Sequence, residues 1–123
     1  MNEHENYCSL ETAKLLKQAG FDWECDKGYD GKRNEELWGL LNFNLFNDKY
    51  SLPSLSVAQK WLREVKGIEV NVLCVYINLI KKYSYAAFEG KYNHEIIDDG
   101  FDTYEEALEA GIKKCLTLIL EKE

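Results

Sequence analysis

The C-terminal part of the chain carries the feature that most constrains the fold, a strongly marked amphipathic helix. Thr103 is followed three residues later by Glu106, which forms a capping box that satisfies the first free amide groups of a helix. Apolar residues then recur at helical spacing: Tyr104, Ala107, Leu108, Gly111, Ile112, Cys115, Leu118 and Ile119. Because one face of this helix is apolar, the rest of the chain must supply a layer that buries it.

The residues before this helix predict that layer. Residues 68–79 are rich in β-branched side chains, and residues 83–89 and 92–97 have the composition of two further strands. Lys81 and Lys82 are expected in the turn between the first two strands. Together these segments predict an antiparallel meander that the last helix covers.

Three positions in the last helix need a neighbour. Gly111 lies inside the apolar stripe, where glycine costs about 1 kcal/mol of helix propensity against alanine, so a close approach of the backbone to the sheet or to another helix is expected there. Leu116 and Leu120 lie off the main stripe. The helix is therefore expected to contact another helix or another subunit on a second side.

The first helix is expected over residues 10–19. Ser9 is a suitable N-cap, and Gly20 stands where a left-handed residue would end the helix. Phe21 is then placed to pack back on Leu16, the contact that accompanies a Schellman end.

A second helix is expected after Pro53 and ends at Gly67. Its apolar stripe consists of Ala58, Trp61, Leu62 and Val65. Between the two helices the signal is weaker: residues 23–29 are expected to form a short strand, and residues 37–46 fit either a strand or a helical turn. The fold of residues 22–52 is thus left open.

These elements predict an α+β fold, with an antiparallel sheet of three or four strands packed by three helices. The length of 123 residues fits one domain spanning residues 1–123, with residues 1–8 expected as a flexible N-terminal tail. The net charge of −7 disfavours binding to nucleic acids and to anionic membranes. No export signal or membrane span is recognised, so a cytoplasmic protein is expected.

The cysteines lie far apart and lack the paired spacing of a zinc site or a redox motif: Cys8, Cys25, Cys74 and Cys115. A nucleophilic cysteine would need a neighbouring imidazole, and the chain contains only His4 and His94. We therefore expect reduced, buried structural thiols, with Cys74 and Cys115 on or beside apolar faces.

One cluster has the residue types of a metal site: His94, Glu95, Asp98 and Asp99. Its spacing matches no ligand pattern, and Asp98-Asp99-Gly100 is ordinary turn chemistry, so solvated turn residues are expected. Glu89-Gly90-Lys91 has half of the pattern of a metal-dependent nuclease but is better explained as a hairpin turn. No catalytic, metal-binding or cofactor-binding residue and no cofactor is predicted.

Three segments carry a resemblance in combination: SLETAKLL at residues 9–16, SVAQKWLREV at 56–65 and YEEALEAG at 104–111. In these segments the chain resembles small uncharacterised proteins encoded by Bacteroides-type gut bacteria, often in prophage-like regions. The resemblance implies no activity. The last helix by itself, entered through Asp102 and Thr103, is also similar to the closing helix of HicB-type antitoxin domains.

The expected function is a non-enzymatic protein-binding or accessory protein of a bacterial mobile element, bound to another protein or to itself. The alternatives are an acidic inhibitor that imitates DNA or a HicB-like antitoxin domain, and a small metal-dependent enzyme that uses the turn from His94 to Asp99. The expected interface residues are Trp61, Arg63, Leu116 and Leu120, because aromatic and arginine anchors dominate binding energies and the leucines lie off the core stripe. Burial of these side chains in the monomer would remove them from any interface.

Overall fold

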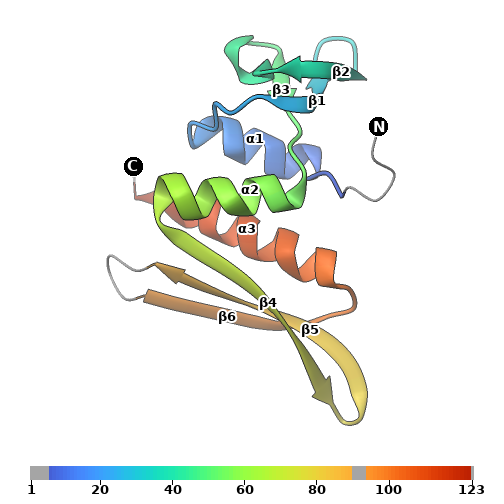
Figure 1. Ribbon diagram of the computed structural model, residues 1–123, viewed down its shortest axis with the longest axis vertical. Coiled ribbons are helices and arrows are strands. Elements are labelled where there is room, and N and C mark those ends of the chain that lie inside the picture. The colour runs from blue at the N-terminus through green and yellow to red at the C-terminus, as the bar shows by residue number, and fades with distance from the viewer. Residues whose placement is uncertain (1–5, 90–93, 123) are drawn as a thin grey trace.

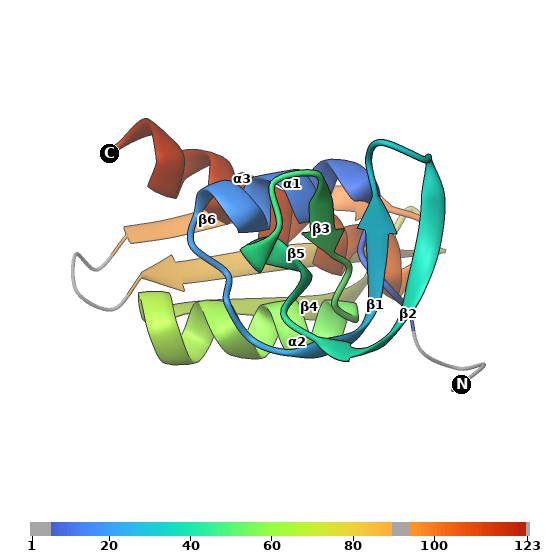
Figure 2. The same ribbon diagram turned by 90° about the horizontal axis from the view of Figure 1, so that it is seen from above.

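The computed structural model describes residues 6–89 and 94–122, which form three α-helices and two three-stranded antiparallel sheets. Figure 1 shows the helices between the two sheets, with the short sheet on one side and the long sheet on the other. Figure 2 shows the short sheet lying over the helices. The predicted α+β class is confirmed, and the first half of the chain adds a second sheet to it.

Helix α1 spans Leu10–Gln18 and has both of the expected ends. The hydroxyl of Ser9 accepts a hydrogen bond from the amide of Thr12 at 3.2 Å. At the other end Gly20 has a φ of +97°, and the amide of Phe21 donates to the carbonyl of Leu16 at 2.9 Å. This is the bond that defines a Schellman motif, and it places the Phe21 ring in the core beside Leu16.

The segment before α1 is fixed at Tyr7 and Cys8. Tyr7 forms a β-bridge with Ser54, and the amide of Cys8 donates to the carbonyl of Pro53 at 2.9 Å. The flexible tail expected over residues 1–8 therefore does not include Tyr7 and Cys8, because their backbone groups have found partners in the loop before the second helix. Residues 1–5 lie outside the described residues.

The short sheet has the order β2-β1-β3. Its strands are β1, Cys25–Asp30, β2, Glu35–Leu41, and β3, Lys49–Ser51. The segment 37–46, expected as either a strand or a helical turn, contains both. Strand β2 ends at Leu41, and a 3₁₀ helix, η1, follows over Phe43–Leu45. The Phe43 ring lies directly over Gly28, where any Cβ would be only 2.4 Å from the ring, so η1 can close on the sheet only because this residue is glycine.

Helix α2 spans Leu55–Trp61 and continues as a π-helical turn, η2, over Leu62–Lys66. Gly67 ends it with a φ of +70°, as the sequence predicts. The side chains of Ala58, Trp61 and Leu62 are buried in the core. Val65 is exposed, because the wider π turn rotates it away from the predicted stripe.

The long sheet has the order β4-β5-β6. Its strands are β4, Ile68–Ile77, β5, Ile80–Glu89, and β6, His94–Phe101. Lys81 and Lys82 lie in β5 and not in the expected turn. The turn consists of Asn78 and Leu79, whose φ angles of +52° and +68° form a two-residue type I′ turn. The turn contains neither Gly nor Pro, so the sequence gives no such signal for it.

The expected turn at Asp98 and Asp99 is also wrong, because both residues belong to β6. Asp98 pairs with Tyr85, and the ladder resumes at Phe101 opposite Tyr83 after a β-bulge. Gly100 lies in this bulge with a φ of +90°, so its turn chemistry bends the strand but does not end it. The expected turn at Glu89-Gly90-Lys91 falls largely outside the described residues.

Helix α3 spans Tyr104–Glu121 and lies across the long sheet, with α1 on its other side and α2 alongside (Figure 1). The hydroxyl of Thr103 accepts from the amide of Glu106 at 3.1 Å, which confirms the N-cap. The Glu106 carboxylate reaches the amide of Asp102 at 3.4 Å, one residue earlier than in the usual capping box. None of the helices in the described ranges is long and apolar enough to cross a bilayer.

One hydrophobic cluster joins all three helices to the long sheet, with Leu16, Trp61, Val70, Ile112 and Leu116 among its fully buried members. The closest contact lies at Gly111, where a Cβ would be 2.8 Å from Val70 and 2.9 Å from the Tyr85 ring. The close approach that the sequence predicts at Gly111 is therefore confirmed, and the sheet is the neighbour.

Replacing Gly111 with valine is expected to lower the free energy of unfolding by about 2 kcal/mol or more, because the added methyl groups must displace Val70 and Tyr85. Urea denaturation followed by circular dichroism measures the change. The matched control is Thr117→Val on the exposed side of the same helix, which should change the free energy by less than about 0.5 kcal/mol. Equal effects of the two variants would contradict a close contact at Gly111.

Candidate protein-binding surface

The aspartates expected to lie in a turn do not form a metal site with each other. Asp98 and Asp99 are both exposed, and Asp98 is paired with Tyr85 at the start of the β-bulge of β6. The side chains of His94 and Glu95 lie outside the described set. Among the residues whose side chains are described, no group of three or more His, Cys, Asp or Glu converges on one point.

Three of the four cysteines are buried, as expected: Cys8, Cys25 and Cys115. Burial raises the pKa of the Cys8 thiol to about 12 and that of the Cys115 thiol to about 11, so both are neutral and unreactive at pH 7. Cys74 is exposed, which contradicts the expectation for it. Cys74 lies opposite Tyr83, at the level where α3 begins, and not under the middle of the helix.

In labelling with a thiol-specific disulfide reagent at pH 8, one thiol per chain is expected to react fast, and Cys74→Ser is expected to remove that fast phase. The three buried thiols should react only at the rate of unfolding, because burial shields them and holds them protonated. In denaturant all four should react at once. A fast phase that persists in Cys74→Ser would contradict the burial of the other three.

The structure places the four expected interface residues in different surroundings. Trp61 and Leu116 are 1% and 0% exposed, so they have no surface to offer a partner and the expectation is wrong for both. Trp61 packs edge-on against the Phe21 ring at 5.5 Å, and Leu116 is covered because α3 is packed on two sides. Leu120 is partly buried against the core, and Arg63 alone of the four is exposed.

The long hairpin of β4 and β5 carries an exposed apolar surface that the sequence reasoning missed. This hairpin surface consists of Leu73, Tyr76, Ile77, Leu79 and Ile80, with exposed fractions of 54, 70, 42, 97 and 59%. Figure 1 shows the end of the hairpin projecting beyond every helix. The available signal was the absence of any charged residue, Pro or Gly from residue 70 to residue 80, which is unusual for a solvated hairpin.

The hairpin surface is exposed for two reasons: α3 does not extend to the turn on the face that it covers, and Leu73 and Ile77 lie on the opposite face of the sheet. Tyr104 opens α3, and its ring meets that of Tyr83 edge-on at 6.3 Å. Tyr83 pairs with Cys74 across the ladder, so this contact marks the last level of the hairpin that α3 reaches. Beyond it, Tyr76 on one face and Ile77 on the other are both open to solvent.

Leu79 occupies the turn at the end of the hairpin, where neither folding nor packing favours leucine. Its φ of +68° is left-handed, which costs a residue with a side chain about 1–2 kcal/mol. Its side chain is 97% exposed and so recovers almost nothing by burial. Asn-Gly is the sequence preferred in such a turn, and here a leucine stands in the place of the glycine.

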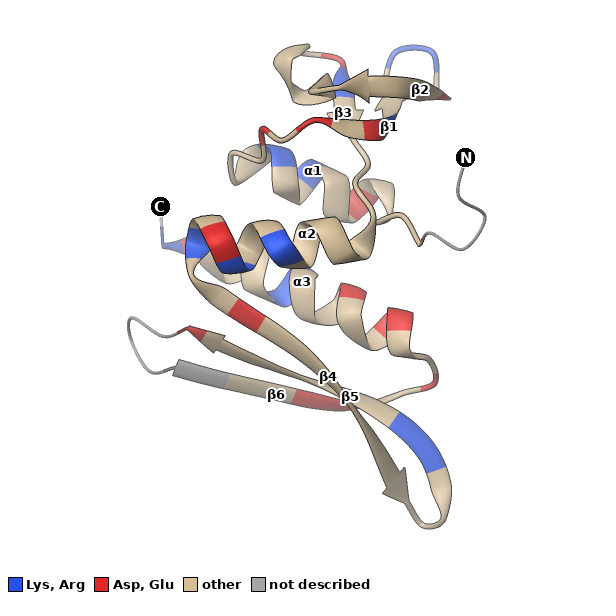
Figure 3. Cartoon of the chain, viewed as in Figure 1, with Lys and Arg blue, Asp and Glu red and all other residues tan. Residues whose placement is uncertain are grey.

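The hairpin also differs from the rest of the chain in charge. Residues 70–87 contain Lys81 and Lys82 and no carboxylate, within a chain whose net charge is −7. Lys82 forms an ion pair with Asp102, whereas Lys81 is exposed on β5 (Figure 3). The projecting end of the hairpin is therefore apolar and weakly basic.

A second group of exposed apolar residues lies on the short sheet: Trp38, Leu40, Leu41, Leu45 and Phe46. Parts of it already have neighbours, since the Trp38 ring meets the Tyr7 ring edge-on at 5.9 Å and Lys49 lies over the Phe46 ring at 5.1 Å. This surface is more fully engaged within the chain than the hairpin surface is.

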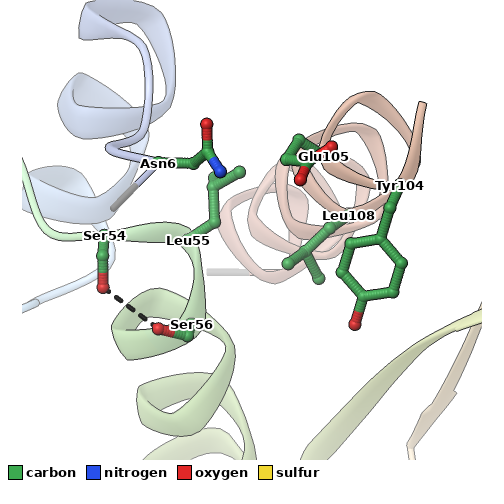
Figure 4. A pocket seen from close by; sticks show the side chains of 7 residues that line it. All are labelled: Asn6, Ser54, Leu55, Ser56, Tyr104, Glu105 and Leu108. Carbon is green, nitrogen blue, oxygen red and sulfur yellow. Dashed lines mark hydrogen bonds between the residues drawn. The ribbon is translucent and has the colours of Figure 1, made fainter. Parts of the chain in front are cut away.

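A small depression lies between the start of α2 and the start of α3 (Figure 4). Its volume is about 160 Å³, below the roughly 300–1,000 Å³ of typical ligand pockets. The hydroxyls of Ser54 and Ser56 are hydrogen-bonded to each other at 3.2 Å, and Glu105 is the charged residue of the lining. This depression has neither the size nor the set of polar groups to bind a substrate.

Comparison with known protein families, with curated proteins and with solved structures finds no match to this chain. The case for function therefore depends on the geometry of the chain itself.

Leu79→Gly is expected to raise the free energy of unfolding by about 0.5–1 kcal/mol. Relief of the left-handed strain exceeds the extra freedom that glycine gives the unfolded chain, and little apolar burial is lost. Thermal unfolding of the purified protein measures the shift. Leu73→Gly, at an exposed and extended position of β4, is the matched control and should destabilise, because it relieves no strain.

Proposed function

We propose that this chain is a protein-binding protein without catalytic chemistry of its own, and that the hairpin surface is where a partner binds. Leu79 is the observation that carries the proposal: it is a leucine in a left-handed turn, almost fully exposed, at a position where glycine would stabilise the free protein. Local strain without a structural benefit is typical of positions that serve a function.

The composition of the hairpin surface supports the same proposal. Clustered apolar side chains that project from the body of a protein are typical of interaction sites, whereas scattered single ones are not. Tyr76 adds an aromatic side chain, a residue type enriched where partners bind. Lys81 beside it favours a partner with acidic side chains around an apolar centre.

The charge distribution favours this proposal over a DNA mimic. A DNA mimic needs a continuous carboxylate surface, but here lysines and arginines lie among the carboxylates along the chain (Figure 3). Lys113 bonds to Glu11 at 3.0 Å and Lys122 bonds to Glu89 at 3.3 Å. A small metal-dependent enzyme at β6 is less well supported, because no group of three or more His, Cys, Asp or Glu converges among the residues whose side chains are described.

The place of the protein in a bacterial mobile element is supported only by the resemblance of residues 9–16, 56–65 and 104–111, and the hairpin adds nothing to it. The proposal therefore has a general part, protein binding, and a narrower part, the mobile element. The identity of a captured partner decides the narrower part.

The test is a pull-down with the tagged full chain from a nuclease-treated extract of its own cells, with bound proteins identified by mass spectrometry. Three baits are compared: the unchanged chain, a hairpin variant with Leu73→Ser and Leu79→Gly, and a control variant with Leu40→Ser and Leu45→Ser on the short sheet. Leu40 and Leu45 are each 73% exposed, so the control removes similar apolar area from another surface.

We expect a stoichiometric partner to be retained by the unchanged chain and by the control variant, and to be lost from the hairpin variant. The loss should be at least about tenfold, because truncating two central contacts costs more than about 1.4 kcal/mol of binding energy. Identical sets of bound proteins on all three baits would contradict binding at the hairpin surface. Selective loss from the control variant would assign the partner to the short sheet.

A further inference from the structure

The two edges of the long sheet are protected to different degrees. Edge strands invite pairing with another chain, and proteins block this with charges, Pro or bulges. The edge strand β6 carries Asp98 and Asp99 and a β-bulge next to Gly100. The other edge strand, β4, has no charged residue, Pro or register shift from Val70 to its end at Ile77.

The free backbone groups of β4 can be identified from two contacts. The side-chain amide of Gln59 donates to the carbonyl of Val70 at 2.5 Å, from α2 and not from β5, so Val70 directs its polar groups away from β5. Ile77 and Ile80 close the two-residue turn, so Ile77 directs its groups towards β5. Alternate residues of a strand direct their backbone N–H and C=O groups to the same side. The backbone groups of Val72, Cys74 and Tyr76 therefore point away from β5, towards solvent at the edge of the sheet.

Within the described ranges, β5 is the only strand that pairs with β4. The part of the edge that is free to pair spans residues 71–77. At one end the carbonyl of Val70 is bonded to the side chain of Gln59, and at the other end the turn begins at Asn78. The centre of this stretch is Cys74. Figure 1 shows that the turn end of this hairpin extends past the helices.

We infer that a second copy of this chain binds along this edge, with β4 antiparallel to β4 of the partner and a two-fold axis at Cys74. Val72 of one copy then lies opposite Tyr76 of the other, and the three outward-facing residues exchange about six backbone hydrogen bonds. The two three-stranded sheets join into one continuous sheet. An isologous contact of this kind closes after two copies and leaves no edge of β4 free.

Charge is the reason to assign a second copy. Two chains that each carry −7 repel each other, so a contact between two copies is favoured where neither copy places a carboxylate. Residues 70–77 contain no charged side chain, so this edge can pair with itself without such a clash. In the proposed register even-numbered residues pair with even-numbered ones, so both copies carry α3 on the same face of the joined sheet.

The contact is modest in size. Seven paired residues extend over about 24 Å at about 3.4 Å per residue, and a contact built on one strand pair buries less than the roughly 1,600 Å² of a standard interface. Association is therefore expected in the micromolar range. The inference rests on the proposed function in that both assign binding to the hairpin, but it uses the backbone groups at the edge of β4, whereas the proposed function uses the exposed side chains of the hairpin surface, Leu79 above all.

Sedimentation equilibrium of the full chain from about 1 to 500 μM tests the inference. Cys74→Lys places two like charges opposite each other on the axis and is expected to weaken association about 100-fold or more. Cys74→Ser keeps every backbone group and should remain dimeric. Ile97→Lys, at a 65% exposed position on the other edge strand of the same sheet, is the matched control and should also remain dimeric.

Thermal unfolding of each variant shows whether it folds, so that loss of the dimer in Cys74→Lys is not confused with loss of structure. Two results would overturn the inference: an unchanged chain that is monomeric throughout the range, or a Cys74→Lys variant that associates as strongly as the unchanged chain. Dissociation by Ile97→Lys but not by Cys74→Lys would also overturn it and would place the contact elsewhere on the sheet.

Hydrogen exchange measured by NMR tests the register directly. The amides of Val72, Cys74 and Tyr76 should be protected at high protein concentration and exchange faster on dilution, whereas those of Leu73 and Val75 should be protected at both, because they bond to β5. A short bismaleimide should link two copies through Cys74 and should fail with Cys74→Ser. Protection that is independent of concentration would contradict pairing at this edge.

The two proposals fail separately. Leu79→Gly leaves residues 71–77 unchanged and is expected to remain dimeric while it loses the partner captured by the pull-down. If the unchanged chain is monomeric but Leu79→Gly still loses the captured partner, the dimer is overturned and the proposed function stands. A dimeric protein whose captured proteins do not depend on the hairpin variant would overturn the proposed function alone.

Discussion

The contact between α3 and the long sheet at Gly111 is the constraint on which the rest of the structure depends. The helix backbone approaches Val70 and Tyr85 so closely that any side chain at residue 111 would collide with them. This approach buries the inner face of the sheet and leaves the other side of α3 for α1 and α2. The core that contains Trp61, Leu16 and Leu116 therefore depends on the position of α3 on the sheet.

The same contact explains why part of the chain is left without cover. Helix α3 has 18 residues and is about 27 Å long, whereas β4 has 10 residues and is about 34 Å long. The helix crosses the sheet and starts at the level of Tyr83, so its apolar side chains cannot reach the end of the hairpin. The exposed surface thus follows from the start of α3, from the length of the strands and from the position of Leu73 and Ile77 on the face of the sheet away from α3.

The residues that break local rules lie together on this uncovered hairpin. Leu79 is strained and exposed, Cys74 is an exposed thiol among buried ones, and the β4 edge lacks the charges that protect β6. Elsewhere local preference and tertiary structure agree, as at the Schellman end of α1 and the N-cap of α3. Sequences depart from local consistency mainly where function requires it, so this concentration on one element is what joins the two proposals.

The sequence by itself determined the features that depend on neighbours in the chain. Caps at Ser9 and Thr103, stops at Gly20 and Gly67 and the antiparallel meander all rest on local backbone preferences and periodicity, and the structure contains them. The sequence also indicated that Gly111 needed a close neighbour. Its errors at Lys81 and Asp98 arose where a turn lacked glycine and where a glycine made a bulge.

Only the tertiary structure decided which apolar residues are buried. Trp61 and Leu116 were expected at an interface and lie in the core, whereas Cys74 was expected to be buried and is exposed. Periodicity shows that a residue belongs to an apolar face, but it does not show whether another element covers that face. Coverage depends on where α3 crosses the sheet, a long-range property that no local pattern in the sequence contains.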